Sequence, residues 1–316
     1  MAERILITGG AGFVGSYLAA SHCASGDEVH ILVRPGEPPR HLPLPLAGVT
    51  VHRIRLDMPS AVAECLQAAG PQIIYHLAGG TGRDPAVSLP CVAGSLLQDV
   101  TNLLTLLSAA AEMRSPPRVF IRAGSLAEYG NGAMPSHEDQ REDPLTVYTA
   151  AMVAGVHYAR MLQPRLPFPV ITSRFALAYG PGQSEDYFLP WLIARCLAGQ
   201  PSVIRRPHSR RDMIYVADLI DALRRTAVSA LPGGTILNLC TGRAPTITEI
   251  ATAAVAACGA APDLLDYQPE EMAGFRADIL HGAPGRARDL LGWQASTSFD
   301  EGLRLCVSSA RERAVA

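Results

Sequence analysis

The sequence predicts an α/β fold in which helices cover both faces of a parallel, doubly wound sheet. Short runs rich in Val, Ile and Leu alternate with longer segments whose apolar residues recur every three or four positions. This repeated strand–helix–strand order favours a parallel sheet, because each helix has to cross back over the sheet before the next strand begins. Apolar residues make up 48% of the chain and charged residues 18%, which is typical of a packed globular protein.

Five strands and four helices are predicted in the first part of the chain. The predicted strands are 4–8, 28–33, 72–77, 118–123 and 170–175. The predicted helices are 12–24, 61–69, 95–114 and 149–162. The Pro-rich string HILVRPGEPPRHLPLPLAG at 30–48 leaves the second strand and is predicted to be a surface loop, not a linker between domains.

A glycine-rich turn directly follows the first predicted strand. The string TGGAGFVG supplies the turn and the start of the next helix, with these candidate residues: Gly9, Gly10, Gly12, Phe13, Val14 and Gly15. Glycines at this spacing let the chain turn tightly, approach a pyrophosphate with its backbone and pack the helix close to the strand. Because the helix N-terminus then faces the phosphates, the turn predicts a Rossmann domain that binds a dinucleotide.

The residue after the second predicted strand indicates which dinucleotide is bound. An NAD-binding Rossmann domain carries an acid there, whereas this chain has Arg34. A guanidinium can pair with a 2′-phosphate through two hydrogen bonds, so we expect NADP(H) as the cofactor. The alternative is that Arg34 is a solvated loop residue. Asp57, after the next short strand, is a candidate for binding the adenine amino group.

Composition argues against several other classes of protein. The formal net charge of −2 leaves no overall basic field for nucleic acid. The seven cysteines include no C-x-x-C pair, so we expect neither a zinc site nor a disulfide framework, and a cytoplasmic location. No stretch approaches the roughly 18 apolar residues that a membrane span requires, so neither export nor insertion is expected.

The histidines do not predict a metal site. His76 ends a predicted strand and is expected to lie in the core. His137 and His157 are not grouped in the sequence with other residues that commonly bind metals. We therefore expect no metal.

An ordered series of motifs over nearly the whole chain resembles the extended short-chain dehydrogenase/reductase family, which includes nucleotide-sugar epimerases, dehydratases and 4-ketoreductases. After TGGAGFVG come IIYHLAGG, GSLAEYG, RFALAYGPG, RRDMIYVADL, NLCTG and ARDLLGW. The resemblance implies that Leu77, Ala78 and Gly79 contact the cofactor. It also implies a homodimer that forms through the predicted helices 95–114 and 149–162.

The second part of the chain differs from the first in composition and in the order of its predicted elements. After about residue 178, Gly and Pro become frequent. The strict alternation of strand and helix is lost in the segments 201–206, 246–257 and 297–308. We expect a dinucleotide-binding domain at 1–178, to which 213–242 returns. Residues 179–316 are expected to form a smaller α/β region that mainly binds substrate.

The resemblance also implies a catalytic pair, from which this chain departs at a third position. Ser125 would hydrogen-bond the reacting substrate oxygen, and Tyr148 would exchange a proton with it. The family lysine four residues after Tyr148 is Met152, which can neither lower the pKa of the phenol nor hold the nicotinamide ribose. We expect Tyr148 to titrate near the ordinary tyrosine pKa of about 10, and thus to be a better acid than base at neutral pH. Carbonyl reduction is the expected direction.

Other positions narrow the chemistry and the substrate. Leu126 and Ala127 stand where the 4,6-dehydratases of the family carry an Asp–Glu pair, so dehydration is not expected. Leu177 stands where the family often has an Asn that contacts a nucleotide sugar. By the same resemblance, Arg211 and Arg276 match two basic positions of the family, the first of which contacts a diphosphate of the substrate.

The basic string RRPHSRRD at 205–212 contains Arg211 and suits phosphate binding. A solvated basic loop is the alternative, with Arg211 paired to Asp212.

Together these observations predict an NADPH-dependent ketoreductase that acts on a nucleotide-linked keto-deoxysugar. Three alternatives stay open. Leu177 favours a reductase of an aromatic polyketide or another natural-product ketone, and the family itself includes epimerases with bound NAD. Met152 motivates the third alternative, a non-catalytic NADP-binding regulatory protein.

Overall fold

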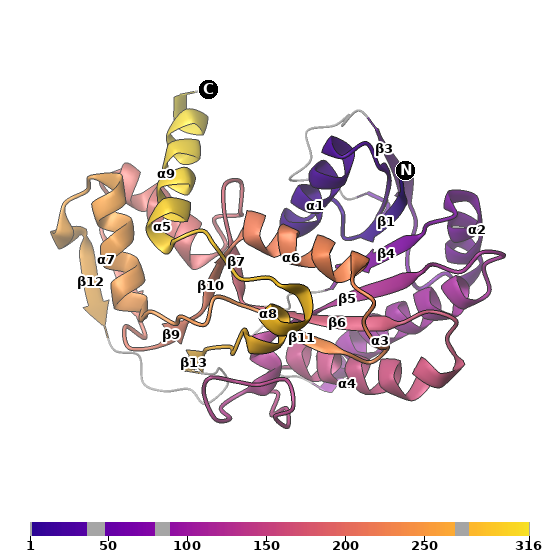
Figure 1. Cartoon of the computed structure of the whole chain (residues 1–316). Helices are drawn as coiled ribbons and strands as arrows, with labels where there is room; N and C mark the ends of the chain where they lie inside the picture. Colours follow the sequence, from indigo (N-terminus) through magenta and orange to yellow (C-terminus); the bar gives the residue numbers. More distant parts are fainter. Residues whose placement is uncertain (1, 37–47, 80–88, 269–277, 316) are drawn as a thin grey trace.

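Seven parallel strands form the central sheet, in the order β11-β6-β5-β4-β1-β2-β3 (Figure 1). This computed structural model describes residues 2–36, 48–79, 89–268 and 278–315. The strands of the sheet are β1 (Arg4–Thr8), β2 (Glu28–Val33), β3 (Val49–Arg53), β4 (Ile73–His76), β5 (Val119–Ser125), β6 (Val170–Phe175) and β11 (Ile236–Leu239). The predicted strands 4–8, 28–33 and 170–175 are confirmed with the same bounds.

Helices cover both faces of this sheet, as the sequence predicts. They are α1 (Phe13–Ala24), α2 (Pro59–Ala69), α3 (Leu89–Ala111), α4 (Val147–Leu162) and α6 (Val216–Val228). The predicted start of α3 at residue 95 is wrong, because the helix already begins at residue 89. Pro90 lies in its first turn, where a helix tolerates a proline because the amide there has no helical partner.

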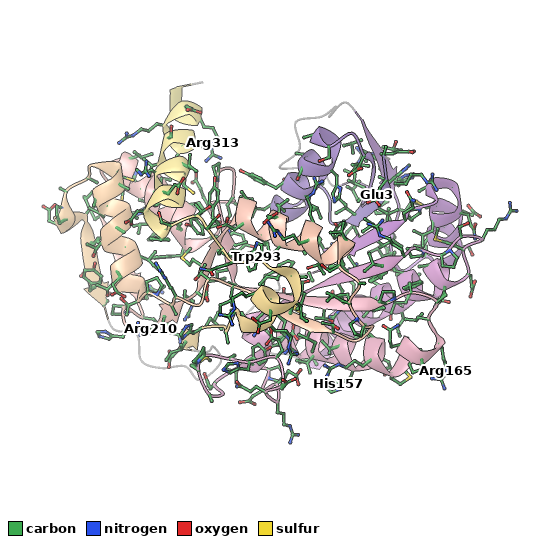
Figure 2. The ribbon with its side chains drawn as sticks, in the orientation of Figure 1. Glu3, His157, Arg165, Arg210, Trp293 and Arg313 are labelled. Carbon is green, nitrogen blue, oxygen red and sulfur yellow. The ribbon has the colours of Figure 1, made fainter. Side chains whose placement is uncertain are left out.

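Each face of the sheet has its own hydrophobic core. Successive side chains of a strand point to opposite faces, so Ile5 and Ile7 of β1 pack with α1 and α6, whereas Leu6 packs with α2, α3 and α4. All three side chains are fully buried. Trp293, near the centre of Figure 2, is almost completely buried in the core on the α1 and α6 side.

The later part of the chain forms a second group of elements beside the sheet, at the left of Figure 1. It contains the helices α5 (Phe188–Leu197), α7 (Ile247–Cys258) and α9 (Phe299–Val315), which share a third core. Three two-stranded parallel pairs accompany them: β7 (Leu177–Tyr179) with β10 (Met213–Tyr215), β8 (Ser202–Arg205) with β12 (Leu265–Gln268), and β9 (Arg210–Arg211) with β13 (Ile279–Leu280). The remaining elements are α8 (Gly285–Leu291) and the short 3₁₀ helices η1 (Leu126–Tyr129), η2 (Gln163–Arg165) and η3 (Pro262–Leu264).

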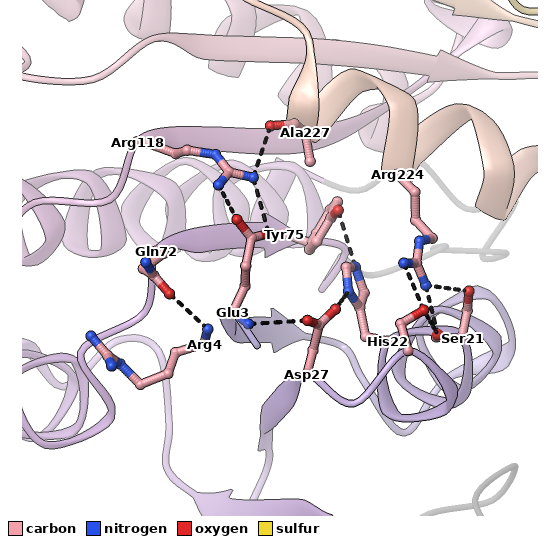
Figure 3. Close-up of polar contacts among 11 residues, drawn as sticks. Glu3, Arg4, Ser21, His22, Asp27, Gln72, Tyr75, Arg118, Arg224 and Ala227 are labelled. Carbon is pink, nitrogen blue, oxygen red and sulfur yellow. Dashed lines mark hydrogen bonds and ion pairs between the residues drawn. The ribbon is translucent and has the colours of Figure 1, made fainter. Parts of the chain in front are cut away.

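A polar network closes the amino edge of the sheet (Figure 3). Asp27 accepts a hydrogen bond from the Glu3 amide at 3.0 Å and lies 2.7 Å from the His22 ring, whose other nitrogen lies 3.2 Å from the Tyr75 hydroxyl. Arg118 forms an ion pair with Glu3. The network joins β1, α1, β4 and the start of β5 at the edge opposite the carboxyl ends of the strands.

Gly15 is expected to be intolerant of any side chain, because α1 approaches the glycine turn too closely. A Cβ at this position would lie 2.2 Å from the Gly9 carbonyl oxygen. We expect Gly15→Ala to lower the free energy of unfolding by about 1–3 kcal/mol, measured by denaturant titration. The matched control is Gly94→Ala in α3, where a Cβ meets nothing within 4 Å and should be neutral or stabilising. Equal stability of the two variants would contradict the close approach.

Candidate active site

Most of the predicted cofactor and catalytic residues lie where the strands of the central sheet end. Gly9 follows β1, Arg34 follows β2, Leu77 follows β4, and Ser125 is the last residue of β5. These strands are parallel, so their carboxyl ends share one edge of the sheet. The strand order reverses between β1 and β4, and open sheets of this kind bind ligands in the crevice at such a reversal.

The glycine turn packs against the chain that leaves β4. Gly9 has φ +71°, and a Cβ there would lie 2.8 Å from the Ala78 nitrogen. The Leu77 amide donates to the Thr8 carbonyl at 3.1 Å, and the Ala78 amide donates to the Thr8 hydroxyl at 3.2 Å. The structure therefore brings two predicted cofactor segments together.

The start of α1 fits a phosphate group. Gly12 is the N-cap residue and offers no side chain to the amides of the first turn. Its own amide donates to the Gly9 carbonyl at 3.0 Å, which closes the turn. Amides that lack a side-chain cap, at the positive end of a helix, are suited to bind an anion such as the pyrophosphate of a dinucleotide.

Arg34 and Asp57, the predicted contacts for the adenosine half of the cofactor, are both exposed. Arg34 directly follows β2, and Asp57 lies in the loop after β3. Arg55 Nε donates to the Asp57 carboxylate at 2.9 Å and holds its pKa below the usual value through this hydrogen bond. The assigned roles of both residues stay predictions.

Ser125 is held at the end of β5 by a buried ion pair that the sequence analysis missed. Its hydroxyl accepts from the Ala127 amide at 3.2 Å and thereby caps η1. Glu128 accepts from the Ser125 amide at 2.8 Å and, through its other oxygen, from Arg174 Nε at 2.9 Å. Both charged side chains are fully buried. The Ser-x-x-Glu spacing in GSLAEYG is a capping-box signature that could have revealed Glu128.

Tyr148 lies in the first turn of α4 and is less acidic than expected. Burial is the largest cause that raises the pKa of its phenol above 10, and the nearby groups Glu128, Tyr187 and Asp99 raise it further. Arg122 acts in the opposite direction. The expected pKa of about 10 is therefore wrong, because it considered the missing lysine but not the loss of solvent around the phenol. The phenol is protonated at neutral pH.

Met152 lies one turn after Tyr148 and is partly buried. Its carbonyl accepts a hydrogen bond at 3.1 Å from Nη2 of Arg122, a residue of β5 that the sequence analysis did not single out.

His76 is buried at the end of β4, as expected. Its Nδ1 lies 2.7 Å from the Thr8 hydroxyl, and burial, with a smaller effect of Arg122, lowers its pKa to about 3. It is therefore a neutral core histidine at physiological pH.

The predicted substrate contacts come from the second group of elements. Leu177 in β7 is 38% exposed, which leaves its side chain accessible. Arg211 in β9 donates through Nη1 to the carbonyls of Arg210 at 2.7 Å and Asp278 at 2.8 Å. Arg276 lies outside the described residues.

Asp212, considered as a partner for Arg211, has other hydrogen-bond partners. The carboxylate is fully buried and accepts from the amides of Thr241 and Gly242, both at 3.0 Å, and from the Thr241 hydroxyl at 2.7 Å. Burial raises the pKa of this carboxyl group, although these hydrogen bonds oppose the shift.

The described ranges lack two further features. They contain no group of three or more His, Cys, Asp or Glu side chains that could hold a metal ion. None of their helices has the length and apolar character needed to cross a membrane.

The doubly wound sheet and the glycine turn at its reversal point, together with the matching family model, define an enzyme of the extended short-chain dehydrogenase/reductase class. The chain belongs to the NAD dependent epimerase/dehydratase family, whose model matches residues 5–240. Nicotinamide dinucleotide binding is a property of this family.

Individual relatives extend this similarity over nearly the whole chain. UDP-glucose 4-epimerase of Mycolicibacterium smegmatis is 29% identical, over 98% of this chain and 99% of that protein. GDP-6-deoxy-D-mannose reductase of Pseudomonas aeruginosa is 26% identical, with 99% of each chain covered. The solved structure of Thermus thermophilus UDP-glucose 4-epimerase in complex with NAD has a TM-score of 0.85 at 26% identity, over 98% of this chain and 99% of that chain.

Proposed function

We propose that this protein is an NADPH-dependent ketoreductase that reduces the keto group of a nucleotide-linked keto-deoxysugar. The observation that carries the proposal is the placement of Tyr148 in the first turn of α4, one turn before Met152 and without a lysine at that position. A phenol without a neighbouring ammonium keeps its proton, so it is ready to donate to a carbonyl oxygen but unable to accept from an alcohol, and the raised pKa of Tyr148 agrees with this. The similarity to GDP-6-deoxy-D-mannose reductase supports a reductive reaction on a nucleotide sugar.

In this proposal the glycine turn binds the pyrophosphate, and Arg34 binds the 2′-phosphate of the cofactor. The reduced nicotinamide, when bound, supplies a hydride to the carbonyl carbon. Tyr148 gives its phenolic proton to the carbonyl oxygen, while the Ser125 hydroxyl donates a hydrogen bond to the same oxygen. Arg211 and Arg276 are assigned to the diphosphate of the substrate, and Leu177 to its sugar.

A nucleotide-sugar epimerase that retains bound NAD is the second candidate. It is favoured by the similarity to two UDP-glucose 4-epimerases. An epimerase of this kind first oxidises an alcohol, so Tyr148 would have to lose its proton before the reaction. The raised pKa makes that step costly, and for this reason we place the reductase first.

A homodimer formed through α3 and α4 is part of the proposal. The two helices pack against each other on one face of the sheet. Met161 of α4 is 52% exposed, so an apolar side chain of this helix is accessible. We also propose that the dinucleotide-binding and substrate-binding parts of the chain divide near residue 178. We further propose a cytoplasmic location.

The reaction is tested by the oxidation of NADPH in the presence of a panel of nucleotide-linked 4-keto-6-deoxysugars. We expect consumption of NADPH, and we expect Tyr148→Phe to lower kcat by about 10²–10⁴-fold because it removes the acid. Tyr158→Phe is the matched control, since Tyr158 lies on the same helix with 44% exposure and should leave kcat unchanged.

Other results of this assay would select another function. Consumption only with aromatic ketones that lack a nucleotide would favour the natural-product reductase. Bound NAD that co-purifies, together with interconversion of nucleotide sugars, would favour the epimerase. Cofactor binding without turnover, with activity appearing only in Met152→Lys, would favour a regulatory protein.

The two directions of the reaction should depend differently on pH. The pKa of Tyr148 is raised, so the acid form persists through neutral pH and is lost only as the pH rises through that pKa. We expect kcat/KM for reduction to be flat across neutral pH. The reverse oxidation needs the phenolate and should accelerate by about tenfold for each pH unit in this range. A reduction rate that falls through neutral pH would identify a different proton donor.

Cofactor choice is tested at Arg34. If its guanidinium binds the 2′-phosphate, Arg34→Ala should raise KM for NADPH by about 10–100-fold, the loss expected for hydrogen bonds to a charged group. KM for NADH should be nearly unchanged. Arg53→Ala is the matched control, because Arg53 is another exposed arginine at the end of the neighbouring strand β3. An equal change for both cofactors in Arg34→Ala would argue against recognition of the 2′-phosphate.

A further inference from the structure

A row of buried polar side chains crosses the central sheet below α3 and α4. Thr8 is paired in register with His76, His76 with Arg122, and Arg122 with Thr172. All four residues are at most 7% exposed. They lie on the same face of the sheet as Leu6 and Phe120, which belong to the core beneath the two helices. Arg122 thus places a guanidinium inside the protein.

The surroundings of Arg122 leave its positive charge without a close counter-ion. Nη2 donates to the Met152 carbonyl at 3.1 Å, and Nη1 lies 3.5 Å from the Thr172 hydroxyl. Within the described parts of the chain, Nε has no hydrogen-bond partner, and no carboxylate lies within ion-pair distance of this guanidinium. Burial lowers the pKa of Arg122, and the carboxylate of Glu128 opposes this shift from beyond ion-pair distance. Arg174, the other fully buried arginine discussed above, has ion pairs with Glu128 and Glu142. A buried charge without such a partner is costly and needs another explanation.

The helix above Arg122 is shaped to admit the guanidinium. Gly155 lies in the interior of α4, where glycine is a poor helix former. A Cβ at this position would lie 2.8 Å from Arg122 Nη2 and 3.2 Å from a methyl group of Leu103. The glycine therefore makes room for the charge directly below the turn that carries Met152.

The titratable groups that act on Tyr148 come from three elements and from the residue before α5. Glu128 in η1, Asp99 in α3 and Tyr187 just before α5 disfavour negative charge on the phenol oxygen, whereas Arg122 in β5 favours it. The position four residues after Tyr148, where the resemblance implies a lysine, carries Met152 instead. The guanidinium below the helix is hydrogen-bonded to the backbone of that same residue.

We propose that Arg122 is the positioning residue that supplies to Tyr148 the positive charge which its own helix lacks. This role rests on the proposed reductase function. As the hydride bonds to the carbonyl carbon, the C=O π bond breaks and the oxygen takes the proton of Tyr148, which leaves a phenolate. Arg122 stabilises that negative charge from below α4 until the phenolate regains a proton from solvent.

The proposal is tested without turnover by placing 3,5-difluorotyrosine at position 148 of the full-length chain. Fluorine makes the phenol more acidic, so its titration falls where the protein stays folded, and ¹⁹F NMR reports it. We expect Arg122→Met to raise the pKa of this phenol by about one unit, as loss of a nearby opposite charge should. Arg122→Lys, which keeps the charge, should restore most of the original pKa.

Two further variants separate charge from structure. Arg118→Met removes an arginine that directly precedes β5 and pairs with Glu3, and this change should leave the phenol pKa unchanged. Adding Met152→Lys to Arg122→Met should return the pKa towards that of the parent chain, because the charge is then supplied from the helix. If Arg122→Met fails to fold, Arg122→Gln carries the same expectations.

An unchanged phenol pKa in a folded Arg122→Met or Arg122→Gln chain would overturn the proposal, even if turnover fell. Failure of Met152→Lys to compensate in that background would also overturn it. A shifted pKa in a protein that consumes no NADPH with any keto sugar would instead retain the electrostatic role of Arg122 and reject the proposed reaction. The two ideas are therefore separable.

Discussion

The parallel register of the central sheet is the constraint on which the candidate site depends. Because β1, β2, β4 and β5 run in the same direction, the glycine turn, Arg34, Leu77 and Ser125 emerge at one edge. An antiparallel strand at any of these positions would move its residue to the opposite edge. The register also pairs residues within the sheet. The arrangement that brings the candidate site residues to one edge therefore also places Arg122 beside His76.

Local patterns in the sequence predicted the sheet and the position of the glycine turn well. Buried strands are short apolar runs, and the glycine turn combines a spacing with a position between a strand and a helix, so both are visible along the chain. The start of α3 at residue 89 was not predicted, although Pro90 occupies a first-turn position that a helix accepts. The pKa of Tyr148 was misjudged because desolvation depends on residues that are distant in the sequence.

Glu128 and Arg122 were both missed, but for different reasons. Glu128 carries a local signature, since Ser125 lies three positions before it, and the sequence could have revealed it. Arg122 lies between the apolar residues Ile121 and Ala123 of β5 and has no neighbour in the sequence that explains a charge. Arg122 donates to the carbonyl of Met152 and fits beside Gly155, which has no side chain. Both contacts form only when α4 packs over β5.

The polar network at the amino edge has a consequence for how this fold can change. Glu3, His22, Asp27 and Tyr75 fasten strands and helices together at the end of the sheet that is remote from the glycine turn. These contacts are therefore remote from the candidate ligand-binding residues, which lie at the opposite rim. Substitutions that retune recognition at the carboxyl rim can accumulate without loosening these anchors, so one scaffold can acquire new specificities while its assembly is preserved.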